Sequence, residues 1–220
     1  MNVPRLALRS IVVVGLLLAV GLPLGCSAQS PDAADSGSGA TSPASTRATE
    51  SSRPVPAGWQ EATVDGLTFA YPAEFERRDD VPEASLQVGI PFTGQPAPPP
   101  QVQVFVETGE VGPLEVREPL TRAQIQQQLG PISIPTSTPV PVTGASAAVQ
   151  FTYEYTTQGG TSVLDTPLEP TPMRQSELLI DVPGLPKYGL RYSAPAVEYD
   201  QTVWRGIVDS IRVTRAGQGS

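Results

Sequence analysis

The chain has 220 residues and a formal net charge of −8, and it contains no histidine, one cysteine (Cys26) and one lysine (Lys187). Nucleophilic sites of the Ser-His-Asp and Cys-His kinds need an imidazole, and structural zinc sites need several Cys or His ligands, so the composition excludes these classes. We therefore predict a chain that is not an enzyme, with no catalytic residues, no metal site and no cofactor.

Residues 1–25 have the layout of a secretory signal peptide. Arg5 and Arg9 lie near the front, an apolar centre follows over residues 11–20, and small residues end the segment. An uncleaved membrane anchor and ordinary secretion are the alternatives. An anchor needs roughly 20 consecutive apolar residues, and the run between Ser10 and Pro23 is shorter. The pattern therefore favours a cleaved signal peptide.

Cys26 closes the run Leu-Pro-Leu-Gly-Cys, which resembles the lipobox of bacterial lipoproteins. The resemblance implies that the thiol of Cys26 receives a diacylglyceryl group before the signal peptide is removed. Pro23 departs from the usual leucine of that motif. Each buried methylene contributes about 0.8 kcal/mol, so two acyl chains make a durable anchor where one does not. We expect a lipid-anchored protein on the outer face of the cell membrane.

Beyond residue 25 the chain carries 12 basic and 22 acidic residues, a net charge of −10. Phosphate binding depends on clustered Lys and Arg, so this balance disfavours nucleic acid and anionic headgroups. We expect no nucleic-acid partner and contact with the membrane only through the lipid on Cys26. Thirteen arginines against one lysine, with abundant Ala, Gly and Pro, indicate a GC-rich genome such as that of an actinobacterium.

Composition divides the remainder of the chain into a tether, a domain and a tail. Residues 26–57 are rich in Ser, Thr, Ala, Gly and Pro and cannot bury enough apolar surface to order, so they predict a lipidated N-terminus and a disordered tether. The tether is either a bare spacer or an O-glycosylated stalk. Residues 58–214 have the length of one domain that folds alone, and residues 215–220 are a disordered tail.

The first half of the domain predicts four strands. Asp65-Gly66 suits a type I′ hairpin turn between strands at 59–64 and 67–71. A short helical turn is expected at 73–78. Two more strands, at 85–90 and 101–107, flank a Pro-rich loop at 91–100 that cannot continue a ladder.

A helix is predicted to begin near Leu120. Thr121 would be its N-cap, Gln124 the capping-box partner of Thr121, and Leu120 would pack on Ile125 as a hydrophobic staple. Gly130 ends this helix.

The second half continues with alternating and helical patterns. After a Pro-rich loop at 131–141, residues 147–156 alternate as a long strand with one buried face. A loop with prolines at 166–172 follows, then strands at 174–182 and 187–193. A helix at 199–210 and an edge strand at 211–214 end the domain.

Two segments, Gly66-Leu67-Thr68-Phe69-Ala70-Tyr71-Pro72 and Tyr199 through Trp204 to Val213, resemble landmarks of the Mog1/PsbP-like family, and especially its LpqN/LpqT lipoproteins of mycobacteria. The resemblance covers residues 58–213. It implies an α+β fold, an antiparallel β-sheet flanked by helices (the Mog1/PsbP-like α/β sandwich). It also implies docking or accessory roles, with no shared active-site residues to carry over.

Several residues could form a site, but each has a plainer structural interpretation. Residues 79–83 and the pair Glu107 and Glu110 offer carboxylates, but the first lacks the spacing of a calcium loop and acidic proteins supply such pairs by chance. Lys187 could act as a base if buried, and is expected to face solvent. Gly159-Gly160 is expected to be a turn, because no following helix or lysine completes a phosphate loop.

An aromatic set could line a ligand pocket, although its spacing favours plain core; it comprises Trp59, Phe69, Tyr71, Phe151, Tyr153, Tyr155 and Trp204. The predicted function is a non-catalytic interaction or accessory module of the cell envelope with an envelope protein partner. The alternatives are a carrier of an apolar envelope lipid and a hydrolase. Stiff Pro-rich loops favour the interaction module because they lose little entropy on docking.

Overall fold

Successive side chains of β7 (Ala147–Thr156) point to opposite faces of the sheet, so the two faces of this strand contribute to different layers of the fold. The structure, a computed structural model, describes residues 55–214 except 83, 110, 163, 164 and 185. The predicted signal peptide, Cys26, nearly all of the tether and the tail lie outside the described residues.

Within those residues the main sheet has seven antiparallel strands in the order β3-β4-β5-β11-β10-β7-β6. Its other strands are β3 (Glu76–Arg78), β4 (Leu86–Gly89), β5 (Gln101–Glu107), β6 (Thr138–Pro139), β10 (Pro172–Asp181) and β11 (Lys187–Pro195). A small sheet holds β1 (Trp59–Val64), β2 (Leu67–Pro72) and β12 (Arg212–Val213), and β8 (Gly160–Thr161) pairs with β9 (Pro167–Leu168).

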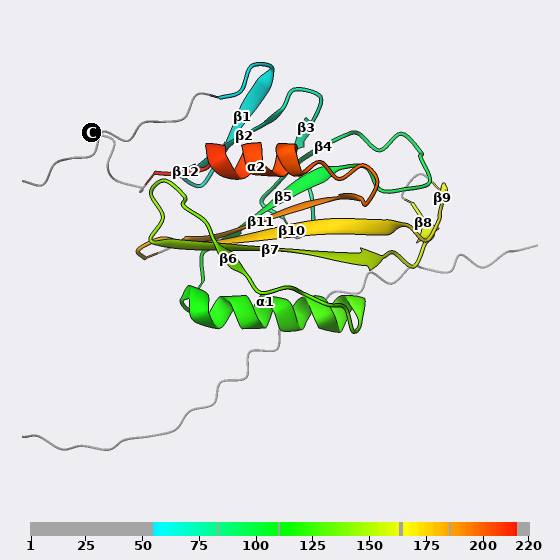
Figure 1. The fold of residues 1–220 in the computed structure, drawn as a ribbon. Helices are drawn as coiled ribbons and strands as arrows, with labels where there is room; N and C mark the ends of the chain where they lie inside the picture. The colour runs from blue at the N-terminus through cyan, green and yellow to red at the C-terminus, as the bar shows by residue number, and fades with distance from the viewer. Residues whose placement is uncertain (1–54, 83, 110, 163–164, 185, 215–220) are drawn as a thin grey trace, which may run out of the picture. The chain divides into compact units, whose positions relative to one another are not determined.

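The two helices of the described region cover opposite faces of the main sheet, α1 (Leu114–Leu129) one face and α2 (Gln201–Ser210) the other (Figure 1). The larger core lies on the α2 side and centres on the fully buried Trp204, Tyr188, Tyr192, Leu178 and Ile180. A smaller core under α1 is made by Leu114, Ile125, Phe151, Tyr153 and Leu179. The predicted α+β fold with an antiparallel sheet flanked by helices is thereby confirmed.

Local sequence signals located the hairpin, the long strand and the second helix. Asp65 and Gly66 have φ of 46° and 87°, as a type I′ turn between β1 and β2 requires. Strand β7 has the predicted bounds. Helix α2 begins after Asp200, whose carboxylate accepts the backbone N–H groups of Thr202 and Val203, and β12 follows as the predicted edge strand.

Two predicted elements were wrong. Residues 73–78 do not form a helical turn: Phe75 is buried, and Glu76–Arg78 pair with β4 as strand β3. Tertiary pairing therefore overrides the local propensity.

The first helix begins at Leu114 rather than Thr121, and the Thr121 hydroxyl donates to the carbonyl of Arg117 instead of capping. Leu120 is 63% exposed and makes no staple. The first turn forms because Asp181, on β10, accepts the Leu114 N–H at 3.0 Å. The predicted end at Gly130 is correct.

Across the described ranges, neither helix combines the length and apolar character that a membrane span would require.

Candidate functional site

The Pro-rich loop at residues 91–100 forms one side of a hollow of about 400 Å³ at the β3–β4 end of the main sheet. Its walls are mainly apolar and come from both this loop and β9: Ile90, Pro91, Phe92, Pro98, Pro99 and Leu168. We call this hollow the loop pocket. Its volume lies within the range of small-molecule and side-chain binding sites, roughly 300 to 1,000 Å³.

Hydrogen bonds fix the loop that builds the pocket. The Ile90 N–H donates to the Pro100 carbonyl at 2.9 Å and closes the base of the loop. The Glu169 N–H donates to the Pro96 carbonyl at 3.2 Å, which joins this loop to the segment that follows β9. Two Pro-rich loops therefore meet here, whereas the third, at 131–141, lies along β7 at the opposite side of the sheet.

Polar groups line the sheet side and the rim of the loop pocket. The Gln87 amide donates to the Gln101 side-chain oxygen at 2.8 Å, so these two neighbours on β4 and β5 satisfy one another. Glu76 and Arg78 stand exposed at the rim on β3. This arrangement suits an apolar group that enters past a charged rim.

Two further hollows lie at other loop edges. One of about 710 Å³ lies between residues 140–148 and 209–214. One of about 620 Å³ runs along β7 beside residues 132–138. None of these three hollows is lined by α1; each lies at loops and strand edges.

A buried ion cluster holds α1 to the sheet. Arg117 is 5% exposed, and its Nη1 lies 2.8 Å from Asp181 Oδ1. Its guanidinium also donates to the carbonyls of Ile180 and Tyr188, each at 3.2 Å. Glu107 Oε2 lies 2.9 Å from Arg117 Nη2 as an ion pair without hydrogen-bond geometry. Arg117 and Asp181 are thus hydrogen-bonded within the cluster, and none of these residues lines a described hollow.

Lys187 belongs to this cluster, so the prediction that it faces solvent was wrong. Its side chain is 12% exposed, and its Nζ donates to the Val182 carbonyl at 2.6 Å and lies 3.7 Å from Asp181 Oδ2. The turn between β10 and β11 folds the lysine back onto the end of β10. A base would need access to a substrate, and Lys187 lines none of the hollows.

A second buried network lies on the α1 side of β7, β10 and β11. Glu177, 3% exposed, accepts hydrogen bonds from the Tyr153 hydroxyl, the Gln175 amide and the Arg191 guanidinium at 3.1, 2.8 and 2.7 Å. Gln175 also contacts the Tyr153 hydroxyl. Burial, and then the Glu177 charge, raise the pKa of Tyr153 well above its usual range. The sequence carries no local signal for this network.

The other carboxylate candidates are solvated or paired. Asp79 accepts from Arg77 at 2.8 Å and Asp80 lies 3.9 Å from Arg78, and all four side chains are well exposed. Glu83 and Glu110 lie outside the described residues. In the described ranges, no three His, Cys, Asp or Glu side chains gather as metal ligands.

Gly159 lies in the irregular segment that follows β7 and Gly160 is the first residue of β8, so the two do not form the expected turn. Both have positive φ, and Gly160 begins β8 rather than a helix. They therefore do not open a phosphate loop.

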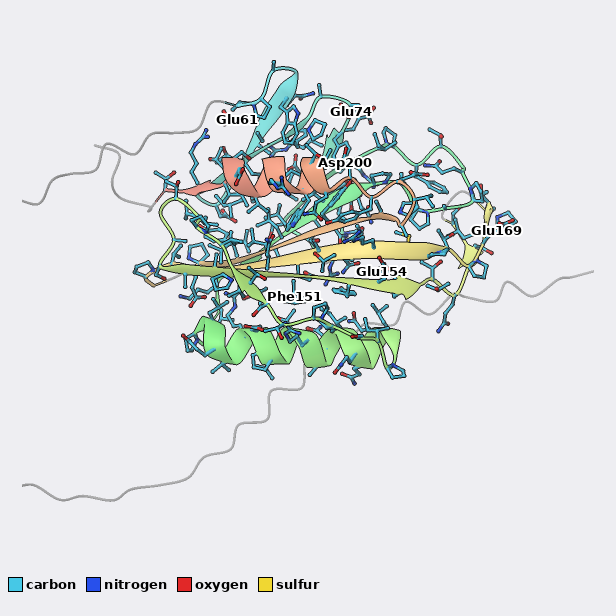
Figure 2. The ribbon with its side chains drawn as sticks, in the orientation of Figure 1. Glu61, Glu74, Phe151, Glu154, Glu169 and Asp200 are labelled. Atoms are coloured by element: carbon cyan, nitrogen blue, oxygen red, sulfur yellow. The ribbon has the colours of Figure 1, made fainter. Side chains whose placement is uncertain are left out.

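The aromatic set divides between the two cores, as its spacing indicated. Phe69, Tyr71 and Trp204, with the partly exposed Trp59, belong to the α2 side. Phe151, Tyr153 and Tyr155 belong to the α1 side, and Phe151 lies between β7 and α1 (Figure 2). The set therefore lines no common pocket. The apolar wall of the loop pocket comes instead from Phe92, Ile90 and Leu168.

Comparisons with known proteins agree on the fold only. No family model matches the sequence, and no curated protein matches it. Two solved structures match with TM-scores below 0.5. A Bacteroides thetaiotaomicron protein has 9% identity over 70% of this chain and 47% of that chain, with a TM-score of 0.42. A Pseudomonas aeruginosa protein of unknown function has 11% identity over 72% of this chain and 98% of that chain, with a TM-score of 0.45. LpqN of Mycobacterium tuberculosis, described as involved in cell envelope biogenesis, matches at 14% identity over 71% of this chain and 92% of that chain, with a TM-score of 0.51. The chain is thus similar to LpqN in fold.

Proposed function

We propose that this chain is a non-catalytic accessory protein of the cell envelope, held at the outer face of the membrane by a lipid on Cys26. In this function the loop pocket binds an apolar part of an envelope protein partner. The observation that carries the proposal is the pocket itself, an apolar hollow of about 400 Å³ built by stiff, hydrogen-bonded loops.

Its construction suits binding. Prolines in the walls restrict the unbound loop, so little conformational entropy is lost when a partner docks. The apolar walls gain from burial, roughly 25 cal/mol for each Å² of apolar surface removed from water. The charged rim of Glu76 and Arg78 is placed to discriminate among partners.

Two further observations support a non-catalytic envelope role. The charged clusters around Asp181 and Glu177 are buried among their own partners and lie outside the loop pocket, whereas an enzyme needs convergent polar groups in its cleft. The fold is similar to that of LpqN, which is described as involved in cell envelope biogenesis.

Site-specific cross-linking in cells tests this function. A photoreactive phenylalanine analogue at Phe92 should capture a defined envelope protein. The same analogue at Val197, which is 95% exposed and lies outside the pocket, should not. Replacing Pro96–Pro100 with a short Gly/Ser loop should abolish the product at Phe92 while the unfolding midpoint stays within a few degrees. Identical products from positions 92 and 197, or none from position 92, would contradict the proposal.

The alternative function, carriage of an apolar envelope lipid, is favoured by the same volume, which exceeds the roughly 300 Å³ expected of a ligand cavity. The cross-linking experiment separates the two, because a lipid adduct adds a small mass to the chain and a protein adduct a large one. A lipid that co-purifies with the full chain, and is lost with the Gly/Ser loop, would replace the first function by the second.

A further inference from the structure

One edge of the main sheet is open along half of β7. Strand β6 pairs only with Gln150 and Val149, and the Val140 N–H adds a bond to the Ala148 carbonyl. The N–H and C=O groups of successive residues in an antiparallel strand point alternately to its two neighbouring strands. Those of Thr152 and Glu154 therefore point to the same side as those of Ala148, away from β10. Past Gln150, no strand of the described region pairs with this side of β7.

A wall stands beside this open edge and turns it into a groove. Residues 132–138 form the wall, and the hollow between it and residues 150–154 measures about 620 Å³. Arg122 of α1 holds the wall in place by donating to the carbonyls of Ile134 and Pro135 at 3.2 and 2.6 Å. The same guanidinium lies 4.6 Å from the centre of the Phe151 ring. The groove is thus preformed, with α1 fixing its width.

The two sides of the groove differ in chemistry. On the α1 side it is bounded by Phe151, Tyr153 and Ile132. On the α2 side stands Arg174, whose Nε is buried without a hydrogen-bond partner. Glu154 Oε1 lies 4.0 Å from that nitrogen, too far for a hydrogen bond, and the Glu154 side chain is 69% exposed. An incoming carboxylate could approach the Arg174 guanidinium, because the side chain as a whole is 41% exposed.

We propose that this groove binds an extended segment of a partner protein as an added strand on β7, with an acidic side chain directed to Arg174 and apolar side chains toward Phe151. Added strands gain affinity from main-chain hydrogen bonds and specificity from pockets for alternate side chains. Thr152 and Glu154 supply the main-chain groups here. The wall of residues 132–138 stands beside the open edge, which disfavours the approach of the sheet edge of a second copy.

Binding of defined peptides to the full chain tests the proposal. The probe is a labelled, end-blocked eight-residue peptide of alternating Val and Thr with one central Glu, measured by fluorescence anisotropy. A matched peptide carries Gln in place of Glu, and a third carries an N-methyl group on every residue and so cannot donate main-chain hydrogen bonds. We expect saturable binding of the first and about threefold weaker binding of the second, since a partly exposed ion pair contributes little. The third should fail to bind.

Two variants at one position isolate the main-chain contribution of β7. Glu154→Pro removes the outward N–H, and Glu154→Thr keeps it while removing the same charge. Glu154→Pro should bind the Glu peptide about fivefold more weakly than Glu154→Thr, the worth of one hydrogen bond. Arg174→Gln should abolish the preference for Glu over Gln.

Hydrogen exchange locates the peptide, with slower exchange expected at residues 151–156. If Glu154→Pro proves unstable, the N-methylated peptide makes the same test from the ligand side. Equal affinity of both Glu154 variants, binding of the N-methylated peptide, slowed exchange only elsewhere, or no saturable binding of any peptide would each overturn the proposal.

Discussion

Among single residues, Asp181 contacts several separate segments of the fold, and no pattern in the sequence predicts this. Its carboxylate contacts Arg117 and Lys187 and accepts the first N–H of α1, and its carbonyl accepts from both the backbone and the hydroxyl of Ser146. The side chain of Asp181 thus fixes the start of α1 and the lysine after β10, and its main-chain carbonyl fixes the residue before β7.

Asp181→Ala should therefore destabilise the protein strongly. It leaves a buried Arg117 without its main counter-ion and α1 without its cap, and breaking a buried pair costs about 3–5 kcal/mol. Chemical denaturation measures the change. Asp79→Ala, which removes an exposed partner of Arg77, is the control and should cost under about 1 kcal/mol. Similar losses for the two variants would mean that the cluster is not a stabilising feature.

Tyr192 predicts how stability responds to alkaline pH. Burial raises the pKa of Tyr192 from about 10 to about 12, so folding favours its neutral form. That contribution is complete below pH 10 and is lost as pH rises from about 10 to 12, on the order of 2–3 kcal/mol. Thermal unfolding from pH 8 to 12 measures it. Tyr192→Phe cannot ionise and should show a shallower decline; parallel curves for the two proteins would contradict the assignment.

Side-chain environments of this kind were beyond sequence prediction. The local sequence predicts that Lys187 faces solvent. Its burial depends on Asp181 and Arg117, and Arg117 lies 64 residues from Asp181. The Glu177 network is likewise assembled across three strands. Local patterns do not encode such contacts.

Among the helices and strands, those with a regular spacing of apolar residues or a clear turn signal were predicted well. The start of α1 was not. Strands β5 and β7 show alternation, and α2 has an apolar stripe ending in buried Trp204, Ile207 and Val208. Helix α1 buries only Leu114, Arg117 and Ile125 while Val116 and Leu120 are exposed. The apolar residues of α1 do not form one continuous face. The buried ion cluster around Arg117 and Asp181 helps to hold α1 to the sheet, whereas an apolar stripe holds α2.

Helix α2 should depend on its N-cap, Asp200, which is labelled at the start of that helix in Figure 2. Asp200→Ala removes the acceptor for two backbone N–H groups and should cost about 1 kcal/mol, whereas Asp200→Asn keeps an acceptor and should cost less. Denaturant unfolding with unchanged m-values measures both. A loss as large for Asn as for Ala would show that the charge, and not the hydrogen bonds, is what matters.

For the whole molecule, the sequence predicted the class of fold but not where hollows would lie. The loop at 91–100 does line a hollow. The three Pro-rich loops do not share one end, because the loop at 131–141 follows β7. Loop positions depend on strand order, and β7 lies beside β10 in the sheet although β8 and β9 separate them in the chain.

Membrane attachment is predicted to depend on Cys26. Cys26→Ser removes the thiol that would be acylated, so the protein should move from the membrane fraction to the soluble extracytoplasmic fraction. Labelling with a palmitate analogue, followed by fractionation, measures both acylation and retention. The control is Ser27→Ala, which changes a neighbouring hydroxyl and leaves the thiol. Equal membrane retention of the Cys26→Ser variant and the wild type would refute lipid anchoring at this residue.

The order of strands in the main sheet sets a distance between the loop pocket and the groove on β7. Four strand spacings separate β4 from β7, about 19 Å at the usual 4.8 Å per strand. A ligand with two epitopes joined by a linker of that span would engage both sites at once, and the second contact would then be intramolecular. The avidity of such two-epitope ligands, measured as a function of linker length, would be highest where the linker just spans the distance between the two sites. The width of the sheet would thus select ligands by the spacing of their epitopes.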